Sequence, residues 1–158
     1  MVGPERTMTS RAAPTLTMAT ADDLADVVAL LSAQFDEHGI DAGDVARGAR
    51  GLIESPERGA IFLATVDGTR VGIAAMPFTW TLEHGGLVAW LDELYVLPSM
   101  RDRGIGRALL DHVLAAARAA GCLAIDLEVD TSHARVERLY ERRGFTRLPR
   151  TRFALRLT

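Results

Sequence analysis

Residues 87–120, LVAWLDELYVLPSMRDRGIGRALLDHVLAAARAA, predict a strand, a turn and a helix in succession. From Leu87 to Leu97 most residues are apolar or favour strands, and Pro98 ends that run. From Gly104 to Ala120 the apolar residues recur at helical spacing. The turn between them therefore leads into the N-terminus of a helix.

This turn combines features that suit a phosphate group. The first turn of a helix presents N–H groups without intrahelical partners and the positive end of the helix dipole. Gly104 and Gly106 keep side chains away from that end, and Arg101, Arg103 and Arg107 add positive charge around it. The turn predicts a pyrophosphate site, and a plain solvated turn is the alternative interpretation. It matches neither the dinucleotide-binding glycine motif nor the Walker motif.

Four segments resemble the GNAT superfamily of acyl-CoA-dependent N-acetyltransferases. Arg101-x-x-Gly104-x-Gly106 resembles its pyrophosphate loop, and residues 91–98, LDELYVLP, resemble its fourth strand. Residues 127–129 and 139–145, LEV and LYERRGF, resemble its fifth strand and the helix that follows. The order and spacing of these segments also agree with the family.

The resemblance implies acetyl-CoA as the co-substrate, lying in a cleft where the fourth and fifth strands run parallel and splay apart. It also implies that the backbone of the fourth strand pairs with the pantetheine arm. Two positions depart from the family pattern: Asp102 stands where many members have glycine, and His133 stands where many have asparagine. The residues expected to bind acetyl-CoA are Leu94, Tyr95, Val96, Arg101, Asp102, Arg103, Gly104, Ile105, Gly106, Arg107, Ala108 and His133.

Acetyl transfer to an amine needs a base, because an alkyl ammonium loses its proton only near the lysine reference pKa. Asp92 and Glu93 are the candidate bases. Strand alternation predicts that they lie on opposite faces, so that only one of them faces the acceptor. The resemblance favours Asp92, which leaves Glu93 to orient neighbouring groups.

The departing thiolate needs a proton, and the resemblance places Tyr140 near the CoA sulfur as the general acid. The alternative interpretation is that Tyr140 packs on the inner face of its helix. His38, His84 and His112 lack the spacing of metal ligands, so no metal is expected. The predicted reaction is direct attack of a primary amine on acetyl-CoA in a ternary complex.

The acceptor side is expected to carry acids and aromatic rings. Glu83 and Glu37 would attract a cation, and Trp80, Trp90 and Phe35 would cover its alkyl part or make cation–π contacts. These aromatic residues are also common in protein cores. We expect a small amine or polyamine-like acceptor, with a peptide or protein amine as the alternative. A non-catalytic acyl-CoA-binding module or another nucleotide-binding protein would also explain the phosphate turn.

Composition limits the partners, disulfides and cellular location that we expect for this protein. The formal net charge of −3 gives no reason to expect nucleic acid or an anionic membrane as a partner. Cys122 is the single cysteine, which excludes an internal disulfide. No apolar run is long enough for a membrane span, and residues 1–13 lack the apolar core of a signal peptide. We expect a cytoplasmic protein with a disordered leader at 1–13, one N-acetyltransferase domain at 14–158, and a possible homodimer.

The rest of the chain predicts an α/β (α+β) fold. The resemblance adds the detail: a single-domain GNAT-like fold with a central mixed, largely antiparallel twisted sheet, helices on both faces and a splayed parallel strand pair. Besides the segment already described, strands are expected at 15–18, 60–66, 71–80, 123–129 and within 145–157, and helices at 22–35, within 41–54 and around 136–140.

Overall fold

The computed structural model describes residues 12–130 and 134–157. His133 and most of the predicted leader lie outside the described residues. The chain forms two compact units, a larger one that ends at Glu128 and a smaller one that begins at Val129. Within the described residues, no helix is long and apolar enough to cross a membrane.

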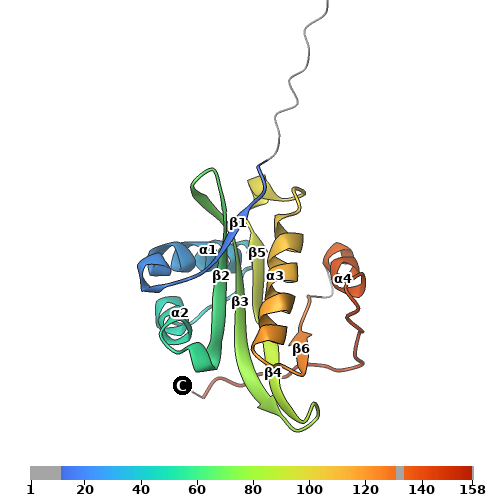
Figure 1. The fold of residues 1–158 in the computed structure, drawn as a ribbon. Helices are drawn as coiled ribbons and strands as arrows, with labels where there is room; N and C mark the ends of the chain where they lie inside the picture. Colours follow the sequence, from blue (N-terminus) through green and yellow to red (C-terminus); the bar gives the residue numbers. More distant parts are fainter. Residues whose placement is uncertain (1–11, 131–133, 158) are drawn as a thin grey trace, which may run out of the picture. The chain divides into compact units, whose positions relative to one another are not determined.

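The larger unit is built on a six-stranded sheet (Figure 1). Its strand order is β1-β2-β3-β4-β6, and β5 also pairs with β3. All pairs are antiparallel except β4 with β6. This mixed, largely antiparallel sheet confirms the predicted fold class. The strands are β1 (Thr15–Met18), β2 (Gly59–Val66), β3 (Thr69–Thr81), β4 (Gly86–Leu91), β5 (Glu93–Val96) and β6 (Ala124–Leu127).

Helices cover both faces of this sheet, as predicted. The helices α1 (Leu24–His38) and α2 (Val45–Ile53) lie on one face, and α3 (Ile105–Ala119) lies on the other (Figure 1). Alternate side chains of β2 divide between the two layers: Leu63 belongs to the core under α1 and α2, whereas the ring of Phe62 meets that of His112 on α3. Burial of these two apolar faces holds the helices to the sheet.

The prediction of a single strand from Leu87 to Leu97 is wrong. The structure divides this segment at Asp92 into β4 and β5. On β3, Phe78 pairs with Ala89 of β4, whereas Ala75 pairs with Glu93 of β5. Two residues of β3 therefore oppose three residues of the partner strand, which is a β-bulge.

The bulge lies opposite Pro77, which has no N–H to donate to a partner strand. The N–H of Asp92 donates to the carbonyl of Ala75 at 3.0 Å and so keeps the extra residue attached to β3. The bulge interrupts the alternation of side chains that the sequence predicted for this strand.

The bulge also ends the contact between the two parallel strands. The pairing of β4 with β6 ends at Leu91 and Leu127, and β5 continues beside β3 alone among the described strands. This is the splayed parallel pair that the family resemblance implied. One edge of β5 is therefore left without a strand partner within the described residues.

The smaller unit contains one helix, α4 (Ala134–Glu141), which is followed by a turn that ends at Gly144. The strands expected within 145–157 are wrong, since these described residues form no strand. Residues 146–157 are all exposed. A strand needs a partner that supplies ladder hydrogen bonds, and none of the described segments pairs with this one.

Candidate active site

The phosphate turn has an unusual backbone that explains part of its sequence. Gly104 is the N-cap of α3 and has φ of 79°, in the left-handed region. Asp102 has φ of 62°, which is uncommon for a residue with a side chain. The departure from glycine at Asp102 therefore falls where the backbone itself favours glycine.

The first N–H groups of α3 have no intrahelical partners. The first helical hydrogen bond runs from the N–H of Ala108 to the carbonyl of Gly104 at 3.0 Å, and Gly104 has no side chain to cap the earlier groups. Arg103 and Arg107 are exposed beside them, and neither has an ion-pair partner within the described residues. These groups together suit a bound phosphate.

Gly106 is not required by packing within the protein. A Cβ atom at this position would meet only Cγ2 of Val96, at the ordinary contact distance of 3.8 Å. The space beside Gly106 therefore lies between the first turn of α3 and β5. A glycine there leaves room for a ligand beside the first turn of α3.

The unpaired edge of β5 exposes backbone groups next to this space. The N–H of Leu97 donates to the carbonyl of Val71 at 2.9 Å, which fixes the alternation of hydrogen bonds along β5. The backbone of Tyr95 therefore faces β3, whereas the backbones of Leu94 and Val96 face the open edge. Two of the three predicted backbone partners of pantetheine thus point outward.

Arg101 is engaged within the protein. Its guanidinium lies 2.7 and 2.8 Å from the two carboxylate oxygens of Glu37 on α1, and its Nε donates to the carbonyl of Val96 at 3.0 Å. The hydroxyl of Tyr95 donates to the same carboxylate at 2.8 Å. Hydrogen bonds first from Arg101 and then from Tyr95 lower the pKa of Glu37. Arg101 and Glu37 therefore join the phosphate turn to α1.

Asp92 and Glu93 line the same pocket, because the bulge replaces strict alternation. Nε1 of Trp90 donates to Oδ1 of Asp92 at 3.0 Å. Nε2 of Gln34 on α1 donates to Oε2 of Glu93 at 2.5 Å. Burial, and then the charge of Asp92, raise the pKa of Glu93 to about 7, while the hydrogen bond from Gln34 opposes this rise.

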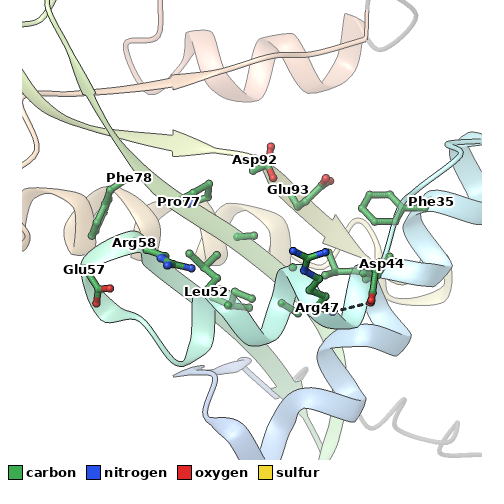
Figure 2. Close-up of a pocket in the computed structure, with 17 residues that line it drawn as sticks. Phe35, Asp44, Arg47, Leu52, Glu57, Arg58, Pro77, Phe78, Asp92 and Glu93 are labelled. Carbon is green, nitrogen blue, oxygen red and sulfur yellow. Dashed lines mark hydrogen bonds between the residues drawn. The ribbon is translucent and has the colours of Figure 1, made fainter. Parts of the chain in front are cut away.

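The pocket has a volume of about 830 Å³ and lies between the sheet and the helices α1 and α2. Figure 2 shows Asp92 and Glu93 on one side of it and Arg47 and Arg58 on the other. Arg47 belongs to α2, and Arg58 ends the short helix η2 (Pro56–Arg58). Phe35 lies in the wall with other apolar residues.

The residues predicted to bind the acceptor are only partly brought together. Phe35 lines the pocket, whereas Trp80, Glu83 and Trp90 do not. The side chain of Trp80 is 73% exposed on β3, and Glu83 is exposed in the turn between β3 and β4. Trp90 contacts the pocket through its hydrogen bond to Asp92.

Tyr140 lies on α4 in the smaller unit and is buried. Its ring packs edge-on against that of Phe145, with the ring centroids 5.5 Å apart. Burial raises the pKa of Tyr140 to about 12. Its hydroxyl therefore stays protonated at neutral pH, and the raised pKa makes it a weaker proton donor than an exposed tyrosine.

Sequence reasoning missed Gln34, Arg47 and Arg58. Gln34 carried a readable signal, because it continues the helical spacing of Val27 and Leu30–Leu31 and is the one buried polar residue among those described. The two arginines carried no such signal, since exposed arginines on a helix are usually solvated. Among the described residues, no group of His, Cys, Asp or Glu is arranged to hold a metal ion.

The sequence matches proteins of known activity. A family model described as the acetyltransferase (GNAT) family matches residues 24–145. A mycothiol acetyltransferase of Propionibacterium freudenreichii is 34% identical over 131 residues, which cover 79% of this chain and 40% of that protein. An aminoalkylphosphonate N-acetyltransferase of Salmonella typhimurium is 32% identical over 83 residues, which cover 52% of this chain and 54% of that protein. The chain thus spans about half or less of the length of these relatives.

The fold matches solved structures as well. A protein of Clostridium acetobutylicum, described as a predicted acetyltransferase and crystallised with acetyl-CoA, superposes with a TM-score of 0.75. The match covers 92% of this chain and 97% of that one at 18% identity, so it shows the shared fold alone. The family match over residues 24–145 spans both the phosphate turn and the acid pair. The chain therefore belongs to the GNAT family of acetyltransferases.

Proposed function

We propose that this protein transfers the acetyl group of acetyl-CoA to the primary amine of a small molecule. The observation that carries the proposal is the position of Glu93, whose pKa of about 7 suits a base at neutral pH. Glu93 lines the pocket and also begins β5, whose open edge leads to the phosphate turn. One strand thus joins a candidate base to a candidate binding site for acetyl-CoA.

The residues that would hold acetyl-CoA belong to β5 and α3. The outward backbone groups of Leu94 and the N–H of Val96 would pair with the pantetheine arm, since the carbonyl of Val96 already accepts a hydrogen bond from Arg101. The N–H groups at the start of α3, with Arg103 and Arg107, would bind the pyrophosphate. Arg101 acts as a positioning residue in this proposal, because Glu37 and the carbonyl of Val96 already take up its guanidinium.

In the proposed reaction, Glu93 removes a proton from the acceptor ammonium, directly or through one water molecule. The neutral nitrogen then forms a bond to the acetyl carbonyl carbon, and the carbon–sulfur bond breaks as the electron pair passes to sulfur. Tyr140 donates its proton to the thiolate and is reprotonated from solvent. The second proton on nitrogen and the proton held by Glu93 pass to solvent. We favour Glu93 over Asp92 because Glu93 is the acid whose pKa is raised towards neutral pH.

A small acceptor is supported by two facts. The pocket volume of about 830 Å³ is within the range typical of small-molecule sites. The Salmonella relative is named for an aminoalkylphosphonate, which is a small amine.

The first experiment measures thermal stability of the purified protein with acetyl-CoA, CoA, ATP and NAD in turn. A ligand that binds only the folded state raises its stability. We expect a rise with acetyl-CoA and CoA alone, followed by release of free thiol when amines are added. A rise without thiol release from any amine would favour the non-catalytic acyl-CoA-binding module, and no rise would refute the reading of the phosphate turn.

A further inference from the structure

The pocket that contains the acid pair also contains two arginines. Arg47 and Arg58 line it, and neither side chain has an ion-pair partner within the described residues. Arg70 and Arg101 differ in this respect, because Arg70 is paired with Asp23 and Arg101 with Glu37. The pocket therefore offers two guanidinium groups that form no ion pair within the described residues, although Asp44 and Glu57 also line it.

The two guanidinium groups lie along one face of α2, although only Arg47 belongs to that helix. Arg47 and Gly51 are four residues apart and so share a helix face. A Cβ atom on Gly51 would lie 3.7 Å from Nη1 of Arg58, which places the Arg58 guanidinium over that glycine. Arg58 thus occupies the position next to Arg47 where α2 lacks a side chain.

Helix stability does not explain Arg47. Asp44 is the N-cap of α2, and its carboxylate accepts the N–H of Arg47 at 2.8 Å. A cation in the first turn of a helix lies at the positive end of the dipole, where it is unfavourable by a few tenths of a kcal/mol. Asp44 caps the backbone of Arg47 and makes no ion pair with its guanidinium.

Asp92 and Glu93 lie across the pocket from Arg47 and Arg58, as Figure 2 shows. Two further acids, Asp44 and Glu57, line the pocket on the side of the arginines. Apolar residues such as Leu52 and Phe35 complete the wall. An ammonium beside Asp92 and Glu93 would leave the rest of the acceptor facing the side of the pocket that holds Arg47 and Arg58. A second ammonium, as in a polyamine, would be repelled by the two guanidinium groups, a repulsion that Asp44 and Glu57 reduce.

We propose that the acceptor is a primary amine that also carries an oxyanion, and that Arg47 and Arg58 bind this oxyanion while Asp92 and Glu93 receive the amine. The oxyanion is a carboxylate, phosphonate or phosphate, the groups that guanidinium binds with paired hydrogen bonds. This inference rests on the proposed acetyl transfer and replaces the polyamine-like acceptor expected from the sequence.

The test compares four acceptors that share a two-carbon amine: aminoethylphosphonate, β-alanine, ethanolamine and ethylenediamine. We expect kcat/KM to be at least about tenfold higher for one or both oxyanion acceptors than for ethanolamine, and lowest for ethylenediamine. The phosphonate and the carboxylate distinguish the two sources of the oxyanion. Equal or higher kcat/KM with ethanolamine or ethylenediamine would overturn the proposal.

Variants locate the effect in the pocket. We expect Arg47→Gln and Arg58→Gln each to raise KM for the preferred oxyanion acceptor by about tenfold, with KM for ethanolamine and acetyl-CoA unchanged. Arg50→Gln is the matched control, because Arg50 is an exposed arginine of α2 that does not line the pocket. An equal loss with ethanolamine, or the same loss in Arg50→Gln, would contradict the assignment.

Failure of this inference is distinguishable from failure of the proposed function. Suppose that acetyl-CoA stabilises the protein, and that CoA thiol is released with ethanolamine or ethylenediamine and with neither oxyanion acceptor. Then only the proposed acceptor class is wrong. If none of the four amines releases thiol, thermal stability with CoA and aminoethylphosphonate together gives a second measurement. If the two ligands together raise the melting temperature more than CoA alone does, and Arg47→Gln loses this additional rise, the oxyanion site is supported. If there is no additional rise, the oxyanion site is refuted.

Discussion

Nε2 of Gln34 donates a 2.5 Å hydrogen bond to Oε2 of Glu93, while Oε1 of the same amide is buried without a hydrogen-bond partner within the described residues. The donated bond stabilises the ionised carboxylate and so opposes the burial that raises the pKa of Glu93. An amide has a donor at one end and an acceptor at the other. Rotation of Gln34 would therefore let Oε1 accept the proton of a neutral Glu93.

Gln34→Leu removes this donor, and we expect the pKa of Glu93 to rise. A hydrogen bond to a charged group contributes about 1.5–3 kcal/mol, and 1.36 kcal/mol corresponds to one pKa unit. The acidic limb of kcat/KM should therefore move about one unit to higher pH, as a pH profile would measure. A purely structural role would lower kcat/KM equally at all pH values and leave the limb in place.

Replacement of each acid tests which one is the base. Glu93→Gln should lower kcat/KM by about 10²-fold or more and abolish the acidic limb near pH 7. Asp92→Asn removes a negative charge that raises the pKa of Glu93. The acidic limb of kcat/KM in this variant should therefore move to lower pH, while activity at pH 8 is largely kept. The reverse pattern, with activity lost only in Asp92→Asn, would make Asp92 the base.

The same carboxylate affects stability, with a sign that follows from its pKa. Glu93 has a pKa of about 7 in the folded protein and 4.5 as a free side chain, so the folded state binds more protons between these values. Its contribution to the free energy of unfolding therefore falls as pH rises from 4.5 to 7. We compare the free energy of unfolding of Glu93→Gln with that of the unmodified protein at pH 5 and at pH 8. The difference should shift in favour of the variant by about 2 kcal/mol from pH 5 to pH 8, allowing for partial exposure. Urea unfolding at the two pH values measures this, and a constant difference would contradict the raised pKa.

Local patterns predicted the parts of the site that lie within one segment. The phosphate turn, the helix after it and the acids before it follow from residues 87–120 alone. The bulge at Asp92 did not follow, because it lies opposite Pro77 on another strand. The pairing of Arg101 with Glu37 joins residues 64 positions apart, which periodicity does not address.

Within 145–157 the error is the opposite one, because the sequence predicted strands that the structure does not form. That segment alternates apolar and polar residues near its end, yet its backbone finds no partner among the described strands. Strand propensity describes how a residue fits a sheet surface and does not supply the neighbouring strand. Pairing is a tertiary property, and here the short-range pattern did not determine it.

Gly106→Leu should abolish acetyl-CoA binding while the protein stays folded. A Cβ atom there meets only Val96 at 3.8 Å, so the side chain would extend into the space between α3 and β5 that the pyrophosphate and pantetheine need. Calorimetric titration with acetyl-CoA measures the loss, and circular dichroism checks the fold. Ala115→Leu, at an exposed position further along α3, is the matched control. Retained affinity in Gly106→Leu would show that the ligand does not use this space.

Tyr140→Phe tests the proposed general acid in a buried position. Burial raises the pKa of Tyr140 to about 12, so the hydroxyl is neutral and able to donate throughout the working pH range. Its removal should lower kcat by about 10²-fold with little change in acetyl-CoA affinity, because the proton is needed only as the thiolate leaves. The ring contact with Phe145 remains in the variant, so the measured difference belongs to the hydroxyl. Stopped-flow measurement of thiol release gives kcat, and a rate equal to that of the unmodified protein at every pH would leave Tyr140 with a packing role alone.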